Sequence, residues 1–136
     1  MKNTYIIIVI FLAVSDAIGQ TLTTDTIQWD IAEFYNVNSN TQEAPGDKLI
    51  VYAGNRAAWS DSDGNVRFDF AISEVLGTWD DISQPGGITL GFSMEGQPGQ
   101  VVVTREGSDF LIEIKLYMDD PSPQEFRLRA DTYSVL

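Results

Sequence analysis

Three oxygen-bearing side chains alternate along a short acidic segment near the middle of the chain. Asp61, Asp63 and Asn65 form an Asp-x-Asp-x-Asn pattern with a glycine just before the Asn. Such alternation can wrap oxygen ligands around Ca²⁺, so these three residues are the candidate metal ligands. The EF-hand register fails, because Val66 stands where the sharp-turn glycine belongs and Ile72 where the bidentate glutamate belongs. A hairpin turn uses the same residue types for backbone with positive φ, and we favour that interpretation.

Histidine and cysteine are both absent from the sequence. Their absence removes Ser-His-Asp and Cys-His catalysis, the usual zinc ligands, disulfide bonds and a lipid-modified cysteine. Catalysis would have to rest on carboxylates, Lys, Tyr, Ser or Thr. The adjacent pairs Asp80–Asp81 and Asp119–Asp120 lie beside turns, where Asp is common, and neither pair marks a glycosidase-like site. We therefore predict no enzyme activity and no cofactor, with Ca²⁺ and a carboxylate-based hydrolase as less favoured alternatives.

The first residues have the pattern of an export signal. Lys2 supplies a positive charge, and residues 5–14 form an uninterrupted apolar run of ten residues. This run has the length of a signal-peptide core and is well short of the ~20 residues of a membrane-spanning helix. Small residues then offer cleavage after Gly19 or, alternatively, after Ala17. We expect residues 1–19 to be a cleaved signal peptide, and the mature protein to be soluble and secreted or periplasmic.

The net charge of the chain is −12. Cleavage after residue 19 removes one Lys and one Asp, so the charge of the mature chain stays the same. An acidic surface disfavours nucleic acid and anionic membranes as partners, because both are polyanions. The remaining length fits one domain, which we place at residues 27–136 after a flexible lead at 20–26.

Alternating apolar and polar residues recur along the predicted domain. The clearest stretch is 66–73, and similar patterns follow at 88–94, 110–118 and 126–131. Short turns rich in Gly and Pro separate them, and no stretch keeps a helical period over ten residues. The pattern predicts an all-β fold of about eight or nine strands. Hairpin-length connections favour an antiparallel meander that closes into an up-and-down barrel, with an open β-sandwich as the alternative.

The order of these motifs resembles the small exported lipocalin-like domains of bacteria. Trp59 precedes an Asp-Gly turn at 60–64, an amphipathic strand follows at 66–73, and a Gly-x-Trp element stands at 77–79. The resemblance covers roughly residues 29–131. It implies a lipocalin-like barrel with an apolar interior, and a role in ligand binding rather than catalysis. It offers no catalytic residues to carry over.

Two kinds of ligand site fit this fold. Apolar side chains on the inward phase could surround a small apolar ligand beneath the loop 38–47 as a lid, or could fill the interior themselves. A surface site for a glycan would instead need exposed aromatic rings, and the polar phase of Tyr117, with Tyr52 less clearly, favours these two side chains. The candidate ligand-binding residues are Phe68, Phe70, Phe92, Ile112, Leu116, Tyr52 and Tyr117. We predict a non-catalytic binding domain for a small apolar ligand, with a glycan- or protein-binding module as the alternative.

Overall fold

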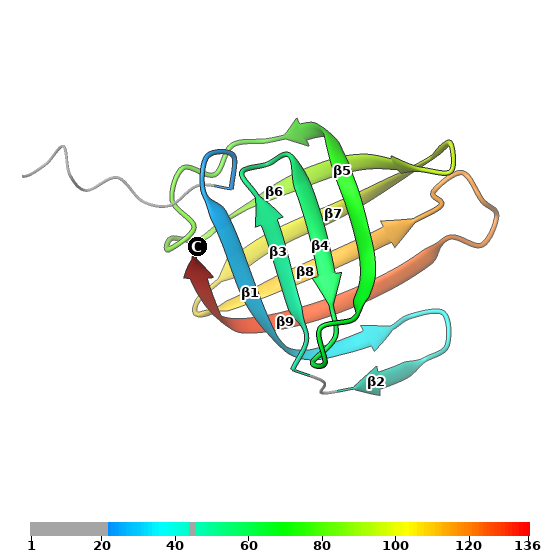
Figure 1. The fold of residues 1–136 in the computed structure, drawn as a ribbon, viewed down its shortest axis with the longest axis horizontal. Helices are drawn as coiled ribbons and strands as arrows, with labels where there is room; N and C mark the ends of the chain where they lie inside the picture. Colours follow the sequence, from blue (N-terminus) through cyan, green and yellow to red (C-terminus); the bar gives the residue numbers. More distant parts are fainter. Residues whose placement is uncertain (1–21, 44–45) are drawn as a thin grey trace, which may run out of the picture.

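The computed structural model describes residues 22–43 and 46–136, which form nine β-strands and no helix (Figure 1). The strands are β1 (Thr26–Asn36), β2 (Thr41–Glu43), β3 (Lys48–Tyr52), β4 (Arg56–Ser60), β5 (Val66–Leu76), β6 (Gly86–Met94), β7 (Gln97–Glu106), β8 (Asp109–Leu116) and β9 (Gln124–Val135). Within these ranges no helix exists that could cross a membrane. The predicted signal peptide and two residues of the predicted lid, 44 and 45, lie outside the described residues.

The strands form a closed antiparallel barrel. Each strand from β3 to β9 pairs with its neighbour in sequence, and β1 pairs with both β3 and β9, which closes the sheet. The short strand β2 pairs only with the end of β1, outside the closed ring of eight. In Figure 1 the strands β1, β3, β4 and β5 pass in front of β6 to β9. The predicted up-and-down barrel is therefore confirmed, and the open sandwich is wrong because β1 and β9 are hydrogen-bonded.

The period-2 pattern places one side chain in two inside the barrel. On β8, Phe110, Ile112 and Ile114 are fully buried, whereas Leu111 between them is 46% exposed. The inward side chains of β1, β3, β6, β7 and β9 behave alike and join a single buried cluster, whereas on β5 only Phe70 is buried. Its fully buried strand members include Ile27, Trp29, Leu49, Val51, Leu90, Val101, Val103, Ile112, Ile114, Leu116 and Leu128. Each contributes on the order of 1.5–3 kcal/mol of hydrophobic stabilisation.

One end of the barrel is closed by residues that precede β1 and by the connection between β5 and β6. Leu22, Trp79 and Ile82 are buried there as part of the main cluster. The indole N–H of Trp79 donates to the carbonyl of Gln84 (3.1 Å), and a guanidinium Nη of Arg105 donates to that of Ile82 (2.7 Å). Leu22 belongs to the segment expected to be a flexible lead, and its side chain is fully buried.

Two register shifts interrupt the pairing of β5. Trp59 pairs with Phe68 and Ser60 pairs with Val66, so Arg67 is left without a partner on β4. A second shift occurs further along, where β5 pairs with β6 and Ser73 is skipped. An unpaired residue of this kind is a β-bulge, which bends the strand and turns its side chain away from the regular alternation. Arg67 is thereby aimed at the other, open end of the barrel.

Candidate ligand site at the open end of the barrel

Four aromatic side chains meet at the open end. The ring of Trp59 on β4 lies at the centre, with ring centroids 5.3 Å from Phe34 on β1, 5.6 Å from Phe68 on β5 and 5.3 Å from Phe126 on β9. Phe68 and Phe126 are 5.7 Å apart. Trp59 and Phe34 are buried, whereas Phe68 and Phe126 are only partly buried, so some ring surface reaches the solvent. These contacts join four strands and form an apolar floor.

The guanidinium of Arg67 lies over this floor. Its Cζ is 5.1 Å from the ring centroid of Phe34 and 5.5 Å from that of Trp59. Cations are attracted to the faces of aromatic rings at such distances, by about 0.5–1 kcal/mol or more when water is excluded. The Arg67 side chain remains 34% exposed. It therefore forms a positively charged edge of the aromatic floor that a molecule from solution can reach.

A buried carboxylate fixes Arg67 and Trp59 in place. The side chain of Asp47 is fully buried, and its Oδ2 accepts hydrogen bonds from the Trp59 indole N–H and from Arg67 Nε, both at 2.7 Å. Its backbone carbonyl accepts the N–H of Ile31 (2.8 Å). The second carboxylate oxygen, Oδ1, is buried without a hydrogen-bond partner. A charge this deeply buried is stable only when it is paired, so Arg67 is constrained by more than surface attraction.

A hollow of about 460 Å³ opens between this aromatic floor and the β1–β2 hairpin, which projects near the β4–β5 turn in Figure 1. We call it the rim pocket; it is lined by Phe34, Asn36, Thr41, Glu43, Trp59, Arg67, Phe68 and Phe126. The aromatic residues come from the barrel, and three polar residues come from the hairpin. An apolar surface with a few convergent polar groups is typical of a small-molecule site. The arrangement can hold a ring system and hydrogen-bond its substituents.

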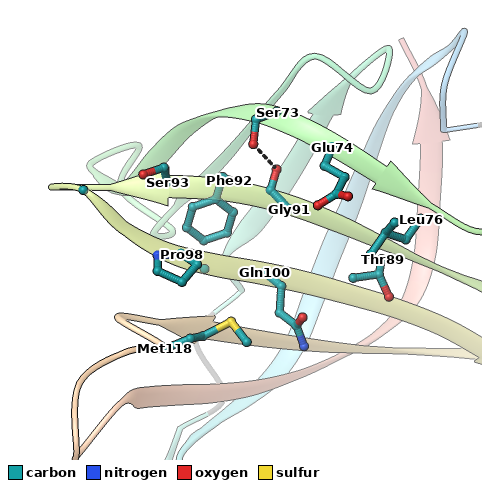
Figure 2. Close-up of a pocket in the computed structure, with 12 residues that line it drawn as sticks. Ser73, Glu74, Leu76, Thr89, Gly91, Phe92, Ser93, Pro98, Gln100 and Met118 are labelled. Atoms are coloured by element: carbon teal, nitrogen blue, oxygen red, sulfur yellow. Dashed lines mark hydrogen bonds between the residues drawn. The ribbon is translucent and has the colours of Figure 1, made fainter.

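A second hollow, of about 430 Å³, lies along β5, β6 and β7 (Figure 2). Gly91 lacks a side chain between Glu74 and Gln100, and the hydroxyl of Ser73 donates to its carbonyl (3.2 Å). The hollow thus follows from the β-bulge at Ser73 and a glycine in the next strand. Among the described residues that line this hollow, Glu74 is the one with a charged side chain. With so few charged groups, the hollow does not indicate a particular class of ligand.

The seven candidate ligand-binding residues fall in three places. Phe68 lines the rim pocket. Phe70 and Phe92 are stacked inside the barrel with ring centroids 3.9 Å apart, and Phe92 also lines the hollow along β5, β6 and β7 (Figure 2). Ile112 and Leu116 are fully buried in the core. The structure therefore brings only Phe68 to the open end.

The two tyrosines proposed for a surface site are only partly buried and do not share a site. Tyr52, at the end of β3, lies beneath the guanidinium of Arg56 (5.1 Å to the ring centroid). Tyr117 follows β8 with φ of 56° and packs against the core cluster. All three Trp residues are buried, at 0–7% exposure, so no Trp ring is free to stack against a glycan.

The candidate metal ligands form a turn. The Oδ1 atom of Asp61 accepts the backbone N–H groups of Asp63 and Asn65, both at 2.9 Å, and Gly64 has φ of 89°. The hydrogen bond from the Asn65 backbone is the main cause that lowers the pKa of Asp61. Within residues 22–43 and 46–136, no three acidic side chains gather in a way that could hold a metal ion. The geometry is that of the turn interpretation.

Several residues at the open end could not be predicted from the sequence pattern. Asp47 lies in a polar loop, and Arg67 stands on the polar phase of the clearest predicted strand, where a solvated side chain is expected. Phe34 and Phe126 are apolar residues that a sequence pattern assigns to the core. Asp47 and Arg67 meet because of a β-bulge and a hydrogen bond between residues twenty positions apart in the sequence, and neither feature follows a periodic pattern.

No protein family, curated protein or solved structure matches the chain. The structure itself assigns the chain to a class of protein. It is an eight-stranded antiparallel barrel with one extra strand, an apolar core and an aromatic pocket at one end.

Proposed function

We propose that the mature chain is an exported, lipocalin-like binding domain without catalytic activity, and that it takes a small amphiphilic molecule in the rim pocket. The observation that carries this proposal is the partly open aromatic floor beside Arg67 and the polar hairpin residues. A ring system on Phe68 and Phe126 would exclude water from their exposed faces, while Asn36 and Thr41 offer hydrogen-bonding groups. The signal-like N-terminus supports export.

The buried cluster supports placing the ligand at the rim and not deep in the barrel. Ile112, Leu116 and their inward neighbours are fully buried among one another. Admitting a ligand between them would separate contacts that each stabilise the fold. The rim pocket requires no such separation, because its hollow already exists.

A fluorescence titration tests the proposal. The neutral probe phenylnaphthylamine, whose emission rises in apolar surroundings, should bind the purified protein and accept excitation energy from Trp59 in the pocket floor. Phe126→Ala removes half-buried ring surface from the floor and should weaken binding about tenfold, which corresponds to about 1.4 kcal/mol. A melting curve of each variant separates lost binding from lost folding.

Leu111→Ala is the matched control. Leu111 is also an exposed apolar residue, but it lies on the outer face of β8, away from the rim pocket. Its replacement should leave probe affinity unchanged. If phenylnaphthylamine fails to bind the folded protein, or if Leu111→Ala weakens binding as much as Phe126→Ala, the rim pocket is not the ligand site.

A further inference from the structure

We infer that the rim pocket is selective for small planar organic anions, with a carboxylate or sulfonate held by the two terminal nitrogens of Arg67. This inference rests on the proposed function, because it names the chemical class of the ligand at the same site. It is carried by the way Asp47 holds Arg67.

The two terminal nitrogens of Arg67 are the donors that could bind a ligand. Asp47 accepts a hydrogen bond only from Nε of Arg67. Among the residues that the structure describes, neither Nη atom donates to a protein acceptor. The end of the guanidinium, with its two parallel N–H groups, is the edge that pairs with a carboxylate through two hydrogen bonds. A buried partner thus occupies one edge and leaves the forked edge open.

The side chain of Arg67 is already oriented before a ligand binds. The guanidinium is held at Nε by a fully buried carboxylate and lies over the rings of Phe34 and Trp59. An arginine on a free surface loses side-chain entropy when it fixes a ligand, whereas this one is already ordered in the absence of ligand. Because the aromatic floor and the open edge of Arg67 line one hollow, a flat ring with an acidic substituent can engage both.

The carboxylates of Asp47 and Glu43 oppose the binding of an anion at Arg67. Asp47 offsets part of the positive charge of Arg67, and Glu43 on β2 lines the same pocket without an ion pair to Arg67. Glu43 repels an anion, but it reaches the pocket from the exposed hairpin, where water screens its charge. Hydrogen bonds from a guanidinium to an anion are roughly twice as strong as neutral ones, so the open edge of Arg67 decides the selectivity.

Two matched probes test the inference. Phenylnaphthylamine and its sulfonate, anilinonaphthalene sulfonate, share the same ring skeleton and differ in one anionic group. We expect the sulfonate to bind the wild-type protein about tenfold more tightly. Glu43→Gln removes the repelling carboxylate and should raise the ratio of sulfonate affinity to amine affinity by a further factor of about two to three.

The variants at Asp47 and Arg67 are designed to keep the protein folded. Asp47→Asn removes the buried charge, retains an oxygen for the Trp59 indole and leaves Arg67 in place, so the preference for the sulfonate should persist or increase. Asp47→Asn combined with Arg67→Met removes the guanidinium without orphaning a carboxylate, and the two probes should then bind equally.

The outcomes separate the two proposals. If the neutral amine binds in the rim pocket and the sulfonate binds no more tightly, the proposed function stands and the anion inference is wrong. The inference is also wrong if the preference survives in the double variant. If neither probe binds, both proposals are wrong.

Discussion

Replacing Arg67 by Met would leave the carboxylate of Asp47 buried with a single hydrogen bond, from the Trp59 indole. Removing one partner of a fully buried ion pair costs about 3–5 kcal/mol, because the other charge remains in a poorly solvated place. The Asp47 side chain is fully buried, but that of Arg67 is 34% exposed, so water already screens the pair from one side. We therefore expect Arg67→Met to lower the free energy of unfolding by about 2–3 kcal/mol.

Urea unfolding followed by Trp fluorescence measures this change. At an ordinary urea dependence of about 1–3 kcal/mol per molar, the midpoint should fall by roughly 0.7–3 M. Arg56→Met is the matched control, because Arg56 pairs with Asp69 on the adjacent strand while both side chains are exposed, at 52% and 37%. Water screens an exposed pair of this kind, so this control should shift the midpoint little.

A second substitution separates the buried charge from other effects of losing Arg67. Asn at position 47 carries no charge, and its amide oxygen can still accept the Trp59 N–H. Asp47→Asn in the Arg67→Met background should therefore restore most of the lost stability, which gives a coupling energy of about 2 kcal/mol in the double-mutant cycle. The reasoning is refuted if Arg67→Met costs no more than Arg56→Met, or if the double variant is less stable than Arg67→Met alone.

Gly99→Ala should lower the free energy of unfolding by about 1–3 kcal/mol, because the added Cβ would lie 2.4 Å from the Phe92 ring and 2.9 Å from the Lys115 carbonyl oxygen. Gly91→Ala should cost less, since the nearest atom to its added Cβ is 3.4 Å away. Equal losses for the two variants in urea unfolding would contradict this prediction. The hydrogen bond from Arg129 lowers the pKa of Glu33. The stability that this pair gives is present above the ordinary pKa of 4.5 and is lost as the pH falls through the lower folded pKa, so the difference in melting temperature between wild type and Arg129→Met should close as the pH falls below 4.5. A difference that widens on acidification would be inconsistent with that sign. Because backbone N–H groups occupy Asp61 Oδ1, excess Ca²⁺ or EDTA should leave the melting temperature unchanged, and a Ca²⁺-dependent rise of several degrees would restore the metal hypothesis.

The sequence determined the strands and their order. Alternation along stretches such as 66–73 and 110–118 is a local property, since successive side chains of a strand face opposite sides. Short Gly/Pro turns make neighbours in sequence neighbours in the sheet, so the meander also follows from local features. Closure into a barrel was an inference about avoiding exposed edges, and the pairing of β1 with β9 confirmed it.

Only the tertiary structure decided where the candidate site lies. The same alternation that marks Phe68 and Ile112 as inward cannot say which reaches an open end and which is sealed in the core, because that depends on strand tilt and on what covers each end. Arg67 stood among polar residues expected to face solvent. A one-residue register shift against β4 turned it over the aromatic floor, and a loop carboxylate twenty residues away in sequence held it there. A β-bulge and a long-range ion pair do not recur at a fixed spacing along the chain, so no periodic pattern in the sequence could predict them.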